Sequence, residues 1–494
     1  MIDYQVGIVG SGFSGIIAGI NLLNSSRNSF VIFEKAKEIG GVWRDNIYPG
    51  CACDIRSNLY SIKSEPNPNW SASYPSQHEV LQYLNNITGK YNLYDHIQFE
   101  TWIVEMKFIE SEGYWVITDN KNRCFKIKLM ILATGPFRLP YIPKIPGIES
   151  FKGACFHSAS WDITSDLSEL NVAIIGTGAS AAQIIPHIAQ SVAKLFVFQR
   201  SATWVLPRWG SKNSNFIKRV YKTLPFIQKL YREVNYWFLE FIGSSFHGNN
   251  ILHKILTRVA LKKLYRSVNN PVTRAKLMPQ YPFGCKRVIL SDDFYPTFNK
   301  PNVKLITDTI SKITKNKIFT DKGENIQVDA IIYATGFTVA DIEEYIHIVG
   351  RNKRVLVDEW RKNGAEAYLG INVSGYPNLC FLLGPNSGLS HSSALHIIES
   401  QATYILQYLA TLEKNGDKGF LDVEPESQKE YNLKILGKLK NKIWSSGCNS
   451  WFINKDQKNI VIYPGLTFQY RKIVKKFNLD NYLILNKESP RLKF

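Results

Sequence analysis

Two glycine-rich loops, each between a predicted strand and a predicted helix, predict an α/β fold with two Rossmann-like units. The first loop is Gly10–Gly15 and the second is Gly176–Ala181. After a later predicted strand, each loop is followed by a triplet, Ala133-Thr134-Gly135 or Ala334-Thr335-Gly336. Apolar residues at helical spacing from about Lys212 to Lys276 predict a helical insert in the second unit. The sequence therefore predicts two dinucleotide-binding domains, one of which carries a helical insert.

Size and composition agree with this fold class. A chain of 494 residues suits two or three domains. Hydrophobic residues make up 45% and charged residues 20%, as in a soluble globular protein. No apolar run approaches the length of a membrane span, and a strand is predicted so near Asp3 that we expect no signal peptide. Seven cysteines without a C-x-x-C pair indicate a reducing compartment, so we expect a cytoplasmic protein in which Cys51 and Cys53 are thiols.

The net charge of +19 is concentrated in the predicted insert. Between Lys212 and Lys276 there are 13 Lys or Arg residues against two acids. We interpret this stretch as a solvated helical face near a site that attracts a phosphorylated dinucleotide, and expect no nucleic-acid partner. Weak association with a membrane surface is the alternative. Aromatic and aliphatic residues at helical spacing are usually core, so we predict burial of Ile227, Leu230, Tyr231, Val234, Trp237, Phe238, Phe241, Leu252, Ile255, Leu256 and Val259.

The first loop has the residues that a close approach to a pyrophosphate requires. Gly10 permits the tight turn after the predicted strand Tyr4–Val9, and Gly12 lets the backbone approach the phosphates. Gly15 lets the next helix pack closely on that strand, with the helix N-terminus facing the phosphates. We assign the loop to cofactor binding, including Phe13 and Ser14.

A carboxylate follows the next predicted strand, Phe30–Phe33. This residue, Glu34, lies 22 positions beyond Gly12. A carboxylate there accepts hydrogen bonds from ribose hydroxyls and repels a 2′-phosphate. The first site therefore fits FAD or NAD and not NADP.

The second loop carries the opposite charge at the matching position. It follows a predicted strand, Asn171–Ile175, and Arg200 lies 22 positions beyond Gly178. A guanidinium can pair bidentately with a 2′-phosphate, so the second site fits NADP(H). We assign to it Gly176, Thr177, Gly178, Ser180, Ala181, Arg200 and Ser201, with Ala181 in the place of the third glycine.

A fixed pattern lies between the two loops. Phe151, Gly153, His157, Trp161 and Asp162 fit F-x-G-x-x-x-H-x-x-x-W-D without a gap. The pattern resembles the identifying stretch of type I Baeyer–Villiger monooxygenases, FAD- and NADPH-dependent enzymes that convert ketones into esters or lactones. In that family it would link the two cofactor domains.

Other stretches carry the same resemblance. Gly40-Gly41-Val42-Trp43 is similar to a family stretch along the flavin, which favours FAD over NAD at the first site. A Tyr48-Pro49-Gly50 turn leads to Asp54 and Tyr60, and the resemblance implies that Asp54 is the active-site carboxylate. Gly284-Cys285-Lys286-Arg287 resembles a G-x-K-R stretch, which implies that Lys286 is a second contact to the 2′-phosphate and Arg287 the catalytic arginine. Both Ala-Thr-Gly triplets resemble turns where the flavin and nucleotide domains meet.

The family mechanism explains the need for these residues. It implies that NADPH reduces FAD, that O2 then forms a C4a-peroxyflavin, and that this species attacks the ketone. A permanent positive charge at Arg287 would stabilise the peroxide anion and the oxyanion of the adduct. Asp54 would orient the guanidinium and moderate its charge.

The resemblance extends into the C-terminal part. Gly384–Gly388 is similar to a family FAD segment, and a helix is predicted from Ala394. Residues Leu389–Ser393 are a candidate wall of the substrate pocket. Trp451 resembles a family tryptophan that contacts NADP, although a buried core role is the alternative. We predict an FAD domain over 1–150 and 338–494, and an NADP domain over 151–337 with its insert at about 212–276.

Other functions remain open at this stage. A flavin-containing monooxygenase that oxidises nitrogen or sulfur is the main alternative, but Trp161-Asp162 and Lys286-Arg287 favour a ketone. A disulfide reductase would need a paired redox cysteine motif, which the sequence lacks. A nucleic-acid or membrane-binding protein with a vestigial Rossmann core is a third hypothesis, which predicts a colourless protein. We expect FAD, NADPH, O2 and a ketone as cofactors and reactants, and no metal.

Overall fold

A computed structural model describes residues 1–339, 346–416, 419–448, 450–454 and 456–485. Its larger sheet has the strand order β17-β4-β5-β6-β1-β2-β3, with β18 beside β6. Strand β1 is parallel to both β2 and β6, whereas β4, β5 and β6 form an antiparallel meander. The strands are β1 (Tyr4–Val9), β2 (Phe30–Phe33), β3 (Ile97–Gln98), β4 (Ile103–Ile109), β5 (Tyr114–Asp119), β6 (Cys124–Leu132), β17 (His347–Val349) and β18 (Leu379–Phe381).

The second sheet is parallel throughout and has the order β12-β9-β8-β16-β7. Its strands are β7 (Ala154–His157), β8 (Asn171–Ile175), β9 (Lys194–Phe198), β12 (Val303–Ile306) and β16 (Ala330–Tyr333). Small sheets complete the strand set: β10 (Val205–Leu206) with β11 (Ile289–Leu290), β13 (Ile310–Ile313) with β14 (Lys317–Thr320) and β15 (Asn325–Gln327), and β19 (Phe420–Val423) with β20 (Tyr482–Leu485).

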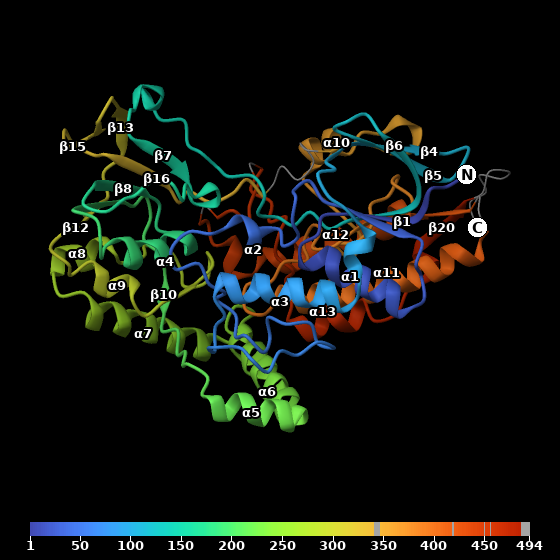
Figure 1. Ribbon diagram of the computed structural model, residues 1–494, viewed down its shortest axis with the longest axis horizontal. Coiled ribbons are helices and arrows are strands. Elements are labelled where there is room, and N and C mark those ends of the chain that lie inside the picture. Colours follow the sequence, from blue (N-terminus) through green and yellow to red (C-terminus); the bar gives the residue numbers. More distant parts are fainter. Residues whose placement is uncertain (340–345, 417–418, 449, 455, 486–494) are drawn as a thin grey trace.

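Helices cover both sheets, and the two units lie side by side (Figure 1). Helices α1 and α11 pack on each other beside the larger sheet, and α4 and α9 pack together beside the second sheet. The helices of the first unit are α1 (Phe13–Asn24), α2 (Val42–Asp45), α3 (Gln77–Lys90), α10 (Leu356–Asn363), α11 (Ala394–Lys414), α12 (Pro425–Lys440) and α13 (Thr467–Ile473). Those of the second are α4 (Ala179–Ile188), α5 (Asn215–Thr223), α6 (Pro225–Ser244), α7 (Asn250–Ser267), α8 (Pro271–Lys276) and α9 (Phe294–Thr297).

The predicted α/β fold with two Rossmann-like units and a helical insert is confirmed. Both glycine-rich loops join a strand to a helix, β1 to α1 and β8 to α4. The chain leaves the larger sheet after β6, forms the second sheet, and returns with β17 and β18. Within the described residues, no helix is both long enough and apolar enough to cross a membrane.

The prediction that the apolar side chains of the insert are core is wrong for much of α6. Leu230, Val234, Trp237, Phe238 and Phe241 are exposed, and so is Ile255 of α7. The physical reason is that α6 packs through its polar face and buries Gln228, Arg232, Asn235 and Glu240. Only part of the predicted set is buried, including Leu252 and Leu256 of α7.

The cysteines are mostly free. Cys51 and Cys53 are thiols, as predicted. A disulfide that the sequence did not indicate joins Cys285 to Cys448, 163 residues away. It ties the segment before Arg287 to the segment before Trp451.

Candidate functional site

The two glycine-rich loops have the same backbone design. Gly10 has φ +105° and Gly176 has φ +113°, which favours glycine at both positions. A Cβ on Gly10 would lie 2.8 Å from the carbonyl oxygen of Ala133, and a Cβ on Gly176 would lie 2.3 Å from that of Ala334. Each loop therefore packs against its own Ala-Thr-Gly triplet.

The loop-to-helix junctions leave backbone donors free. Gly12 is the N-cap of α1 and Gly178 is the N-cap of α4, and neither helix has a side-chain cap or an acidic residue in its first turn. A Cβ on Gly15 would lie 1.9 Å from the carbonyl oxygen of Gly10, so close packing of α1 requires glycine there. Both helix N-termini can thus bind an anion with unpaired N–H groups. The other loop residues assigned from the sequence, Phe13, Ser14, Thr177, Ser180 and Ala181, lie at these two junctions.

Glu34 lies at the end of β2, buried and held by hydrogen bonds. Its carboxylate accepts from the Ser11 backbone at 2.9 Å and the Ser11 hydroxyl at 2.7 Å. It also accepts from the Ala36 backbone at 3.0 Å and from the Arg44 guanidinium at 3.1 Å. These bonds fix a negative charge beside the first loop.

The G-G-V-W stretch lies beside the same loop. A Cβ on Gly41 would be 3.3 Å from the Cα of Gly12, so the two segments are in close backbone contact. Val42 begins α2. The indole nitrogen of Trp43 donates to the Tyr60 hydroxyl at 3.0 Å, and the Tyr60 ring packs edge-on against Phe13.

Three polar residues of the second unit gather where a 2′-phosphate is expected. Arg200 and Ser201 follow β9, and the Lys286 ammonium donates to the Ser201 hydroxyl at 3.1 Å. Burial and the positive charge of Arg200 together lower the pKa of Lys286. Two cations that repel each other at one place are a site for an anion, because an anion relieves the repulsion.

Asp54 and Arg287 form an ion pair across the two units. The Nε and Nη2 atoms of Arg287 donate to the same carboxylate oxygen of Asp54, at 3.0 and 2.5 Å. The negative charge of Asp54 raises the pKa of Arg287, so the guanidinium stays charged. The side chains are 32% and 29% exposed, so both groups remain accessible to a reactant.

Backbone contacts hold each partner of this pair. Arg287 stands just before β11, which pairs with β10 of the second unit. Gly284 precedes it with φ +86°, and a Cβ there would lie 2.3 Å from the Phe246 ring. These constraints fix the segment that carries the guanidinium.

The loop that carries Asp54 docks on α4 of the second unit. Gln183 accepts from the Tyr48 hydroxyl at 3.1 Å and donates to the Ala52 carbonyl at 2.9 Å. A Cβ on Gly50 would lie 2.7 Å from the carbonyl oxygen of Gln183. The Tyr48-Pro49-Gly50 turn is therefore an interface between the two units.

The Phe151–Asp162 stretch forms the edge of the second sheet. Gly153 precedes β7, and a Cβ there would lie 2.0 Å from the carbonyl oxygen of Asp329. The Phe151 side chain packs on the apolar cluster of this sheet, and Trp161 packs edge-on against Phe156. Asp162 accepts from Thr164 and Ser165, which lowers its pKa to about 2.

His157 links this stretch to the connections between the units. Its Nδ1 accepts from the Ala159 backbone at 3.0 Å, so a neutral ring carries its proton on Nε2. Burial lowers the pKa of His157, which favours that neutral form. The ring stands edge-on to Phe337, with centroids 5.7 Å apart.

The two chain connections pair with each other at this place. Residues 139–141 and 335–338 exchange backbone hydrogen bonds, Tyr141 to Gly336 at 2.8 Å and Thr338 to Leu139 at 2.9 Å. Phe137 and Phe337 pack together across them, and Trp451 packs edge-on against Phe137. Trp451 is 37% exposed, so it is not a buried core residue.

Residues 3–359 match the model of the flavin-binding monooxygenase-like family. The chain belongs to this family. A Baeyer–Villiger monooxygenase of Streptomyces coelicolor is 35% identical over 97% of this chain and 92% of its own length. One of Pseudomonas aeruginosa is 37% identical over 97% of this chain and 91% of its own length.

Solved structures share the fold of this family member. A structure of OTEMO in complex with FAD and NADP has a TM-score of 0.87 and 25% identity, covering 98% of this chain and 99% of its own. A cyclohexanone monooxygenase from Rhodococcus sp. Phi1 bound to NADP+ has a TM-score of 0.86 at 24% identity, with coverage of 98% and 99%.

The residues of this family member fit two dinucleotides of different charge. Uncapped helix N-termini suit two pyrophosphates, Glu34 suits unmodified ribose hydroxyls, and the Arg200–Lys286 pair suits a phosphorylated ribose. At Gly178 a Cβ would meet no heavy atom within 4 Å, so there is open space at the second loop.

Sequence reasoning missed several residues of the site. Arg44 and Ser11 hold Glu34, and Gln183 holds the Asp54 loop. Arg208 donates to the Cys53 carbonyl at 3.2 Å, next to Asp54. Arg44 directly follows the G-G-V-W stretch, so its place next to the first site could have been predicted from the sequence. Nothing in the sequence indicated a role for Gln183.

The candidate pocket wall, Leu389–Ser393, follows β18 in the chain, leads directly into α11 and contacts α6. His391 and Ser393 are buried. The His391 ring lies 3.3 Å from a carboxylate oxygen of Glu240 on α6, and Ser393 caps α11. The segment is thus a contact between the first unit and α6.

Proposed function

We propose that the chain is an FAD-containing, NADPH-dependent Baeyer–Villiger monooxygenase that inserts one oxygen atom of O2 beside a ketone carbonyl. The observation that carries this proposal is the Asp54–Arg287 pair, which joins the two dinucleotide units and is accessible. Relatives of 35% and 37% identity over nearly the whole chain are named Baeyer–Villiger monooxygenases, which supports it.

We assign the cofactors by the charges at the two loops. FAD binds at Gly10–Gly15, Glu34 and Gly41–Trp43, and NADPH binds at Gly176–Ala181 with Arg200, Ser201 and Lys286. When bound, FAD supplies the activation of O2, and NADPH supplies the electrons. The FAD domain is proposed to be 1–150 with 338–494, and the NADP domain 151–337.

The protein residues have separate tasks in this reaction. Arg287 presents a permanent positive charge, which stabilises the negative charge that develops on the carbonyl oxygen of the ketone. Asp54 fixes the direction of the guanidinium through two hydrogen bonds to one oxygen. Because Asp54 comes from one unit and Arg287 from the other, the direction of the guanidinium is fixed only when the two units pack together.

A nitrogen- or sulfur-oxygenating flavin monooxygenase is the second candidate. Such a reaction develops no oxyanion on a carbonyl, so it gives no use for the Arg287 charge. We propose the cytoplasm as the compartment, since five of the seven cysteines are free; the Cys285–Cys448 disulfide is the exception that this proposal has to accommodate.

Product analysis tests the proposal. The purified flavoprotein is mixed with NADPH, air and a panel of cyclic, linear and aryl ketones, together with a thioether and an amine. We expect esters or lactones by mass spectrometry. Sulfoxide or N-oxide without any ester would assign the chain to the second candidate.

A further inference from the structure

In helix α6 the polar and apolar faces are exchanged compared with an ordinary surface helix. Its buried face is mostly polar, with Tyr236 as the buried aromatic residue, and its exposed face is apolar. The exposed face, which we call the α6 stripe, is 44–63% exposed. Its members recur three or four residues apart along one side of the helix. They are Phe226, Leu230, Val234, Trp237, Phe238 and Phe241.

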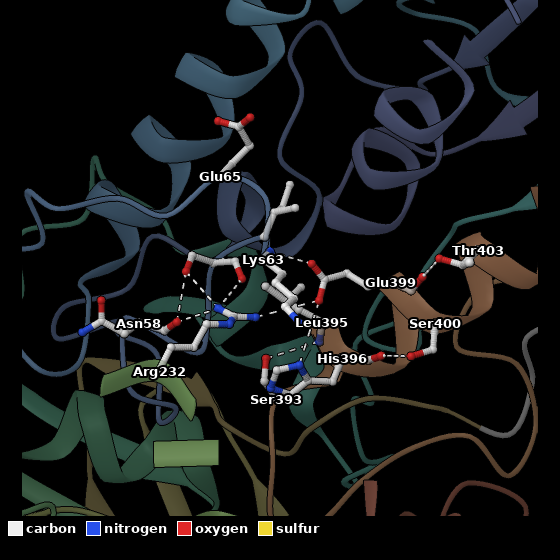
Figure 2. Close-up of polar contacts among 12 residues, drawn as sticks. Asn58, Lys63, Glu65, Arg232, Ser393, Leu395, His396, Glu399, Ser400 and Thr403 are labelled. Atoms are coloured by element: carbon white, nitrogen blue, oxygen red, sulfur yellow. Dashed lines mark hydrogen bonds and ion pairs between the residues drawn. The ribbon is translucent and has the colours of Figure 1, made fainter. Parts of the chain in front are cut away.

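The buried face of α6 holds the helix firmly in this orientation. Arg232 donates to the carbonyls of Asn58 and Ser61 at 2.6 and 2.9 Å, and lies 3.8 Å from Glu399 of α11. Figure 2 shows the Arg232 side chain pointing between Asn58 and Glu399, with His396 beside it. Rotation of α6 to bury the stripe would expose these bonds, so the stripe is a fixed surface feature.

Neighbouring elements extend the apolar surface. Phe216 and Ile217 of α5 and Leu224 before α6 are exposed. Phe468 of α13 is exposed as well, with its ring centroid 5.9 Å from that of Trp237. Helices α5 and α6 project from the lower edge of the molecule, away from both sheets (Figure 1). Exposed apolar residues gathered on neighbouring helices in this way mark an interaction site.

Basic residues surround the stripe. Helix α5 places Lys218, Arg219 and Lys222 between its apolar residues, and Lys229 lies on α6. Lys472 of α13 is exposed one helical turn from Phe468. The exposed acid of α6 is Glu233. An exposed apolar face bordered by Lys and Arg has the pattern of helices that lie in a bilayer interface.

We propose that the α5–α6 face binds the surface of an anionic lipid bilayer, with the α6 stripe inserted among the headgroups and the surrounding Lys and Arg residues on the lipid phosphates. The positive charge around the stripe favours an anionic bilayer over a second copy of the chain, and the stripe itself favours a bilayer over a nucleic acid. A second copy packed on the same face would bring these basic residues against each other, because a two-fold interface pairs a surface with itself. A nucleic acid would use the cations and leave the aromatic stripe in water.

Vesicle co-sedimentation of the full-length flavoprotein tests this. We expect binding to phosphatidylcholine vesicles that contain about 30% phosphatidylserine, and weak binding without it. Raising the salt from about 0.1 to about 0.5 M should reduce the binding. The variant Leu230→Gln/Trp237→Gln/Phe241→Ser should lose more than about tenfold in partitioning. The variant Lys218→Glu/Arg219→Glu/Lys222→Glu should lose the preference for phosphatidylserine.

The matched control carries Ile163→Gln and Leu433→Gln, which change exposed apolar residues outside this face. It should bind as the unmodified protein does. Each variant must retain flavin and NADPH consumption, which establishes that it is folded. The proposal is overturned if the unmodified protein leaves both vesicle types unbound, or if the stripe variant binds equally well. A dimer that dissociates on stripe substitution, without vesicle binding, would assign the face to a second copy.

Discussion

The Arg200–Lys286 pair should determine the preference for NADPH over NADH. The Lys286→Met variant keeps an unbranched side chain but removes the ammonium group, which lies 4.8 Å from the centre of the Tyr281 ring. A hydrogen bond to a charged group contributes about 1.5–3 kcal/mol, which corresponds to a roughly 10- to 150-fold loss of kcat/KM for NADPH. Arg200 is exposed, so solvent screening puts Arg200→Gln near the lower limit, at about tenfold.

The assay compares steady-state kcat/KM for NADPH and NADH in each variant. The value for NADH should change little, because NADH has no 2′-phosphate. Lys262→Met, at an exposed position of α7, is the control and should leave both values unchanged. Equal losses with both nucleotides would refute the assignment, because they would show a general effect on the fold or on hydride transfer.

Two stability predictions follow from buried contacts. Gly153→Ala should destabilise the fold by about 1–3 kcal/mol, because its Cβ would meet the Asp329 carbonyl, whereas Gly89→Ala on α3 has open space and should stabilise it slightly. Denaturant unfolding measures both, and equal effects would contradict the packing argument. Burial lowers the pKa of His247 to about 3 in the folded protein. Below pH 6.5, the ordinary pKa of histidine, this residue therefore binds a proton in the unfolded chain but not in the folded one. Lowering the pH from 7 to 5 should therefore reduce the free energy of unfolding by about 2 kcal/mol, and the His247→Phe variant should lack this part of the pH dependence.

Local motifs predicted much of the fold and of the site. The glycine loops and the residues 22 positions beyond them belong to one dinucleotide-binding βαβ unit, so a local motif is enough to predict them. Strands β1, β2 and β8 have the predicted bounds. The proximity of Lys286 to Ser201, and of Arg287 to Asp54, came from the family resemblance and not from spacing.

The orientation of α6 could not be predicted in the same way. Periodicity identifies two faces of a helix but not which face meets the protein, and burial of the apolar face is the ordinary outcome. Here the partners of Arg232 are backbone carbonyls of Asn58 and Ser61, more than 170 residues away, which leave no trace in sequence composition. The Cys285–Cys448 disulfide is equally non-local.

The ester yield of an Arg287→Ala variant tests the central claim most directly. Anaerobic stopped-flow measurements should show that NADPH still reduces the flavin at nearly the rate of the unmodified protein, because Arg287 acts after that step. Ester formation from the best ketone should fall roughly 10²- to 10³-fold, the usual cost of one removed group that stabilises an oxyanion. Arg287→Lys keeps a charge without the two-donor contact to Asp54, so its rate of ester formation should lie between those of Arg287→Ala and the unmodified protein. Ester formation by Arg287→Ala at nearly the unmodified rate would contradict the account.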